Sequence, residues 1–116
     1  MEVVFEQDFH IGEDSRLVKR LYKVEPSDSF PDGLMFALQY LWHKEKEWIE
    51  VVRIDNYKHA PDKTGAHVHK FGAAEVEFKG MTFEEAETYL TELAERIKKE
   101  ILLGERKNGK NWDSSW

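Results

Sequence analysis

Three histidines lie close together in the segment DNYKHAPDKTGAHVHKF, which occupies residues 55–71 of this 116-residue sequence. Imidazole gains or loses a proton near neutral pH, so it can serve as a general acid, a general base or, when neutral, a metal ligand. Basic side chains also gather around the segment, although the chain as a whole has a net charge of −6. The strongest chemical signal in the sequence is therefore a locally basic segment that contains His59, His67 and His69.

The spacing of these histidines predicts a single site. His67 and His69 are two residues apart, so in a β-strand both side chains project from the same face. Their Cβ atoms would stand roughly 7 Å apart, close enough for both imidazoles to reach one ion or one substrate group. His59 precedes them by a loop that contains Pro61 and Gly65, and this loop could fold the third imidazole back toward the pair.

The first interpretation is cleavage of RNA by acid–base catalysis without a metal ion. Such a reaction needs a base for the 2′-hydroxyl, an acid for the leaving oxygen and a cation for the phosphate. The three histidines can transfer the protons, and Asp55 can orient one of the imidazoles. The protein would then be a metal-independent ribonuclease without a cofactor, with the histidines and Asp55 as catalytic residues. The residues that would bind the substrate phosphate are Arg53, Lys58 and Lys70.

The same histidines support two other interpretations. Three neutral imidazoles with an open fourth position could bind zinc or another divalent transition metal, with His59, His67 and His69 as ligands. Alternatively, the histidines are polar residues of a sheet edge that bond to carboxylates and backbone, and the protein is a noncatalytic protein-interaction domain. Spacing alone does not separate these interpretations.

Composition narrows the range of functions. The chain has no cysteine, so it has no disulfide bond and no thiolate for catalysis or zinc binding. Its net charge of −6 argues against nonspecific coating of DNA, because phosphate neutralisation supplies most of that affinity. Charged residues reach 34%, a proportion that suits a protein built for heat. Neither a signal peptide nor an apolar run of about 18 residues is present, so we expect a cytoplasmic protein with no membrane partner.

Apolar patterning predicts the elements that must position these residues. Runs rich in β-branched and aromatic residues indicate strands over residues 1–8, 16–25, 34–43 and 48–57, and one bent or two short strands over 66–79. Within residues 48–57, strict alternation would put Ile49, Val51, Arg53, Asp55 and Tyr57 on one face. The prediction is an α+β fold, with an antiparallel β-sheet of four to five strands and one long C-terminal α-helix packed on one face.

The helix is the clearest element. Thr82 and Glu85 form a capping box that marks its start. Gly104 stands where a helix-ending glycine is expected, so we predict a helix over residues 82–103. The corresponding division is a single domain over residues 1–104 and a polar tail over 105–116. Apolar residues recur at helical spacing, and the row predicted to face the sheet is Ala86, Leu90, Leu93, Ile97 and Ile101.

The pattern DNYKH…GAHVHKFG, followed by a short strand and a capped helix, resembles the small TumE-like proteins. These are prokaryotic proteins regarded as toxin components of toxin–antitoxin pairs. The resemblance covers roughly residues 48–103 and implies a toxin-type activity on RNA or translation, with an antitoxin protein as partner. The sequence leaves a homodimer open as well. The matching positions are Asp55, Asn56, His59, His67 and His69.

Overall fold

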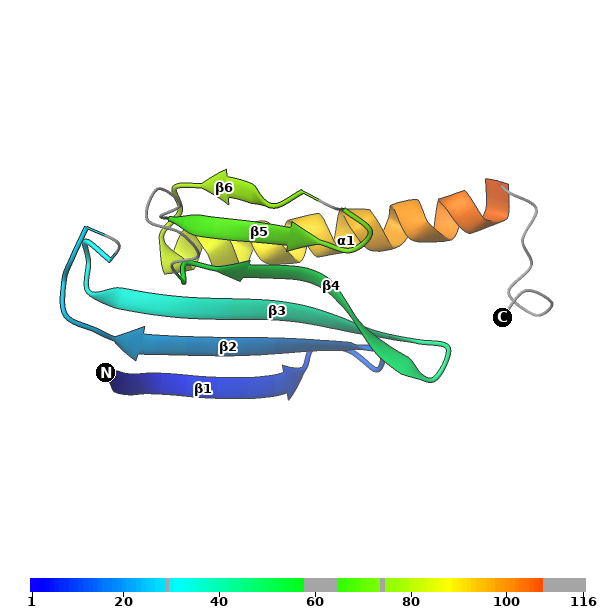
Figure 1. Cartoon of the computed structure of the whole chain (residues 1–116). Helices are drawn as coiled ribbons and strands as arrows, with labels where there is room; N and C mark the ends of the chain where they lie inside the picture. The colour runs from blue at the N-terminus through cyan, green and yellow to red at the C-terminus, as the bar shows by residue number, and fades with distance from the viewer. Residues whose placement is uncertain (29, 58–64, 74, 108–116) are drawn as a thin grey trace.

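The computed structural model of the chain describes residues 1–28, 30–57, 65–73 and 75–107. Six strands form one sheet in which every strand pairs antiparallel with the next strand along the chain (Figure 1). The predicted antiparallel sheet with one long C-terminal helix is confirmed, with six strands in place of four or five. The strands are β1 (Glu2–His10), β2 (Ser15–Lys23), β3 (Leu34–Lys44), β4 (Glu47–Asp55), β5 (Ala66–Lys70) and β6 (Glu77–Lys79).

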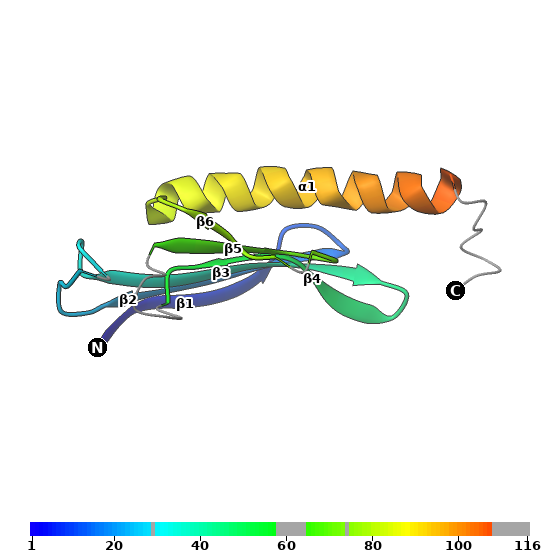
Figure 2. The same ribbon diagram turned by 45° about the horizontal axis from the view of Figure 1, so that its top comes forward.

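The helix α1 (Phe83–Lys107) forms a second layer over one face of the sheet, where it contacts β3 and β4 (Figure 2). Its start follows the capping box: the Glu85 N–H donates to Thr82 Oγ1 at 3.2 Å, and the Thr82 N–H donates to Glu85 Oε1 at 2.9 Å. The ring of Phe83 then meets the ring edges of Phe5 and Phe36 at centroid distances of 5.7 and 5.6 Å. These contacts dock the first turn of α1 on the sheet.

The hydrophobic core lies between α1 and the sheet. From the helix, Ala86, Leu90 and Leu93 are buried, while Ile97 and Ile101 are partly buried against the core, so the predicted apolar row does face the sheet. From the sheet, every second residue of β3 enters the core and is covered by the helix layer. The buried sheet residues of this core include Phe36, Leu38, Tyr40, Trp42, Val52, Ile54, Ala66 and Val68.

A β-bulge in β4 overturns one part of the predicted alternation. The register of β4 against β3 shifts between Tyr40 and Leu41, and Val51 is the extra residue. Ile49 therefore pairs with Trp42 and packs on the helix side. Because the bulge reverses the side-chain phase, Ile49 does not share a face with Arg53 and the residues that follow it.

The helix end also differs from the prediction. α1 continues through Gly104 to Lys107, so the expected stop at residue 103 is wrong. Glycine costs only about 1 kcal/mol in a helix interior, and no proline follows it to end the helix. Residues 108–116, which make up most of the predicted tail, lie outside the described residues. Within the described part of the chain, no helix is long and apolar enough to cross a membrane.

Candidate functional site

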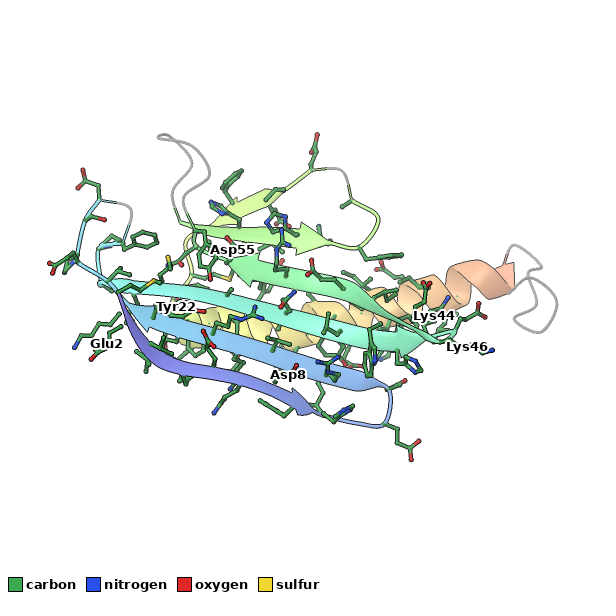
Figure 3. All side chains as sticks on the ribbon, turned by 60° about the horizontal axis from the view of Figure 1, so that its bottom comes forward. Glu2, Asp8, Tyr22, Lys44, Lys46 and Asp55 are labelled. Atoms are coloured by element: carbon green, nitrogen blue, oxygen red, sulfur yellow. The ribbon has the colours of Figure 1, made fainter. Side chains whose placement is uncertain are left out.

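The sheet face that α1 leaves uncovered, called here the open face, carries both polar and apolar side chains. Figure 3 views the molecule from this side, with Asp8, Tyr22 and Asp55 on strands β1, β2 and β4 and with α1 behind the sheet. Ile54 and Val68 belong to the core under the helix, so their strand neighbours project to the open face. Polar side chains of β4 and β5 therefore meet on the side of the sheet opposite α1.

Strand register brings the predicted site residues together. Asp55 is opposite His67 in the β4–β5 pair, and Arg53 is opposite His69. His67 and His69 thus share a face, as their spacing predicts. The two pairs follow one another along the same strands, so all four side chains form one group, which we call the Asp55 cluster.

The carboxylate of Asp55 is the centre of this cluster. Its Oδ1 lies 3.5 Å from Nδ1 of His67, and its Oδ2 lies 3.6 Å from Nε2 of His69. The guanidinium Nε of Arg53 is 3.5 Å from the same Oδ2. The backbone N–H of Tyr57 also donates to Oδ1 at 3.1 Å. One carboxylate therefore contacts two imidazoles and one permanent cation.

Burial divides the cluster into a covered and an accessible half. The side chains of His67 and Asp55 are 0% and 6% exposed, whereas those of His69 and Arg53 are 21% and 39% exposed. The ring of Phe78 on β6 meets the His67 ring edge-on at a centroid distance of 4.7 Å. A ligand approaching from solvent would therefore meet His69 and Arg53, with Asp55 and His67 holding them from beneath.

A hydrogen-bonded chain extends the cluster toward β2. Glu50 Oε1 is 3.6 Å from NH1 of Arg53, and its Oε2 accepts a 2.8 Å hydrogen bond from the Gln39 amide. The amide oxygen of Gln39 in turn accepts from Arg20 at 3.2 Å. Arg53 is therefore held between the carboxylates of Glu50 and Asp55.

Asn56 supports the cluster through the backbone of the neighbouring strand. Its Oδ1 accepts from the Phe36 N–H at 2.8 Å, and its Nδ2 donates to the Leu34 carbonyl at 2.9 Å. These bonds clamp the end of β4 to β3 at the residue that follows Asp55. The residue after it, Tyr57, has a raised pKa because burial and the Asp55 charge both disfavour its phenolate.

The structure does not bring every predicted site residue to this place. Lys70 alternates with His69, so it projects to the other side of β5, where its Nζ lies 3.2 Å from Glu77. Lys58 and His59 lie outside the described residues. The predicted residues that do come together are Arg53, Asp55, His67 and His69.

Sequence reasoning missed three residues that shape the cluster. Gln39 is a polar residue within the most apolar strand, which is a signal that it faces a polar environment. Glu50 precedes the bulge, so its position beside Arg53 required the strand register. Nothing in the sequence pattern connects Phe78 with His67, because their contact depends on the pairing of β5 with β6.

The metal interpretation depends on a residue outside the described set. Among residues 1–28, 30–57, 65–73 and 75–107, no group of three or more histidine, aspartate or glutamate side chains is arranged to hold a metal ion. The predicted third ligand, His59, lies outside the described residues. A site for zinc or another divalent metal at His59, His67 and His69 thus stays a prediction.

Comparison with known proteins adds no relative. The chain matches no protein-family model, no curated protein and no solved structure. Its function is therefore argued from the geometry of the Asp55 cluster.

Proposed function

We propose that this chain is a TumE-like protein that binds and cleaves RNA at the Asp55 cluster. The observation that carries the proposal is the position of Asp55, whose carboxylate lies within 3.5–3.6 Å of His67, His69 and Arg53 on the open face. A histidine backed by a carboxylate and placed next to an arginine has the parts needed for proton transfer at a phosphate. This combination is less useful to a domain that only packs against another protein.

The proposed reaction is transfer of the RNA phosphate to its own 2′-oxygen. The bond between phosphorus and the 2′-oxygen forms while the bond to the 5′-oxygen of the next nucleotide breaks. A base takes the proton of the 2′-hydroxyl, and an acid gives a proton to the departing 5′-oxygen. The products are a 2′,3′-cyclic phosphate and a 5′-hydroxyl. DNA lacks the 2′-hydroxyl, so this chemistry selects RNA.

The accessible half of the cluster would perform this chemistry. His69 is the imidazole that both reaches solvent and contacts Asp55, so it is the proposed proton-transfer residue. Arg53 would neutralise charge that develops on the phosphate oxygens. Asp55 and His67 act as positioning residues, because both are covered. His59 is the proposed second proton-transfer residue, on the basis of the sequence.

The resemblance also suggests the setting of this activity. We propose a cytoplasmic toxin-type protein whose activity a separate antitoxin protein restrains. A toxin that cleaves RNA without a metal would be active as soon as it folds, so restraint by a partner is expected. The homodimer stays an open prediction.

The test is cleavage of labelled single-stranded RNA by the purified chain in the presence of EDTA. We expect 2′,3′-cyclic phosphate products, a bell-shaped dependence of rate on pH, and full activity with EDTA. The variant His69→Ala should lose the activity. Lys70→Ala is the matched control, since it alters the next residue of the same strand on the opposite face. A wild-type protein that neither binds RNA at low salt nor cleaves it would refute the proposal.

A further inference from the structure

A second group of side chains lies at the other end of the open face, around Trp48. The ring of His43 lies 4.9 Å from the Trp48 ring at an interplanar angle of 40°, and the ring of His10 meets it edge-on at 5.8 Å. The guanidinium carbon of Arg16 is 5.0 Å from the centroid of the same ring. We call these four residues the Trp48 cluster.

Four strands supply this cluster. His43 and Trp48 are opposite each other in the β3–β4 pair, and His10 and Arg16 are opposite each other in the β1–β2 pair. His10 and His43 are far apart in the sequence, and no motif connects them. Only the order of the strands shows that both surround one indole ring.

The Trp48 cluster is not part of the hydrophobic core. Trp48 is 37% exposed, whereas Trp42, which lies on the helix side, is 5% exposed. His10 and His43 are also exposed. Proteins that bind single-stranded nucleic acids commonly stack bases on an aromatic ring that lies at the surface near basic side chains.

Arg16, the permanent cation of the Trp48 cluster, is paired with Asp8. Asp8 holds Arg16 by accepting hydrogen bonds from its Nε and NH2, and this bonding lowers the pKa of Asp8 below its usual range. The guanidinium is thereby held over the Trp48 ring in a cation–π contact.

We propose that the Trp48 cluster is a second subsite for single-stranded RNA, where a base stacks on Trp48 while a distant phosphodiester reacts at the Asp55 cluster. This inference rests on the proposed function and adds the substrate class. Trp48 and Arg53 pair with His43 and Gln39, which are four residues apart on β3, so about 13 Å separates them at a rise of about 3.3 Å per residue. A stacked strand advances about 3.4 Å per nucleotide, so about four nucleotides bridge this distance.

The surface beside and between the two subsites offers hydrogen-bonding groups. Arg20 and Gln39 flank the Asp55 cluster on the open face, level with Asp55 and Arg53, and a 3.2 Å hydrogen bond joins the guanidinium to the amide oxygen. Glu50 lies between the two subsites on β4, where it accepts a hydrogen bond from Gln39 and contacts Arg53. The inferred substrate is consequently an unpaired RNA segment of about five nucleotides or more, since a stacked trimer reaches only one cluster.

The experiment compares binding and cleavage of a uridine octamer and a uridine trimer by the full chain. Trp48→Ala should weaken octamer binding by about 5- to 150-fold, the range for losing one base–aromatic stack, and should leave trimer cleavage unchanged. Trp48→Phe should retain most of the octamer affinity because it keeps a stacking ring. The matched control is Phe71→Ala, which removes an exposed aromatic ring beside α1.

The outcomes separate this inference from the proposed function. If the wild type cleaves RNA but Trp48→Ala binds the octamer as tightly as the wild type does, the second subsite is refuted and the proposed function stands. If the wild type neither binds nor cleaves RNA, both fail. Thermal melting checks each variant, and Trp48→Thr replaces Trp48→Ala if the alanine variant melts early, because threonine favours a strand.

Discussion

The two faces of the sheet each carry a polar cluster, and the described side-chain contacts within the two clusters differ in length. Under α1, Lys98 Nζ lies 3.1 Å from both Ser15 Oγ and the Tyr40 hydroxyl, and that hydroxyl also donates to Glu95. On the open face, Asp55 contacts its imidazoles and guanidinium at 3.5–3.6 Å. We call the first group the helix anchor.

The bond lengths suggest different tasks for the two clusters. Hydrogen bonds near 3 Å between buried polar groups fix one arrangement, and in this case they tie the helix to β2 and β3. Contacts of 3.5–3.6 Å are longer than ordinary hydrogen bonds, a feature that is also common in catalytic groups without ligand. The helix anchor therefore stabilises the fold, and the Asp55 cluster is the better candidate for chemistry.

The helix anchor combines serine, tyrosine and lysine, a set that can be catalytic elsewhere. The pKa of Lys98 decides against that role. Burial works to lower it, but the Tyr40 hydroxyl and the charges of Glu95 and Asp14 outweigh burial and raise it. Lys98 is therefore a stable cation that donates hydrogen bonds, and it does not act as a base that would activate Ser15.

The largest expected effect is on stability, and it comes from a substitution in the hydrophobic core. Leu93→Ala removes a side chain that is 7% exposed between α1 and the sheet. We expect a loss of about 2–5 kcal/mol in the free energy of unfolding, measured by urea denaturation. RNA cleavage per folded molecule should stay unchanged below the unfolding transition. A Leu93→Ala protein as stable as the wild type would contradict the observed packing.

A substitution on the open face should have the opposite result, with a change in activity and little change in stability. His69→Ala should lower the rate of RNA cleavage by about 100-fold or more, because it removes the proposed proton-transfer group. The melting temperature should change little, since His69 is partly exposed. A large loss of stability with no change in rate would show that the Asp55 cluster is structural, like the helix anchor.

A smaller effect tests the helix anchor. Tyr40→Phe leaves the buried ring in place but removes the hydroxyl that contacts Ser15, Glu95 and Lys98. We expect a loss of about 1–3 kcal/mol in unfolding free energy, because Lys98 remains partly buried with fewer partners. Tyr89→Phe, on the same helix layer, is the control and should change stability by less than about 0.5 kcal/mol. RNA cleavage should be unaffected in both variants.

The smallest effect is a pH dependence at Asp14, beside the helix anchor. Burial works to raise its pKa, but hydrogen bonds from Ser15 Oγ at 3.0 Å and Trp42 Nε1 at 3.2 Å lower it overall. A carboxyl whose pKa is lower in the folded state stabilises the fold above its unfolded pKa, and this contribution disappears as pH falls through the folded value. Asp14→Asn should therefore lose less stability than the wild type between about pH 5 and pH 2.

The effect of Asp14 must be separated from the effects of other carboxyl groups that titrate in acid. Asp8 and Glu85 also have lowered pKa values, so both proteins will lose stability in acid. Only the difference between Asp14→Asn and the wild type reports on Asp14. This difference is obtained from unfolding free energies measured by urea denaturation at each pH. If the unfolding free energies of the two proteins depend on pH in the same way, Asp14 does not contribute to the acid dependence.

Local patterns in the sequence determined the elements and part of the site. The capping box at Thr82 and the apolar row ending at Ile101 were sufficient for the start and the buried face of α1, because helix capping and periodicity act within a few residues. Strand alternation was sufficient to put His67 and His69 on one face. The same rule separates Lys70 from His69, so the sequence already contained the reason why that lysine lies apart from the cluster.

Tertiary structure alone decided which strands face each other and in which register. The bulge at Val51 shifts side chains between faces, and the pairing of β4 with β5 sets Asp55 opposite His67. Likewise, Trp48 meets His10 only because β1 to β4 lie in order across one sheet. Such contacts join residues far apart in the chain, and they depend on turns, bulges and the packing of α1, which no local periodicity encodes.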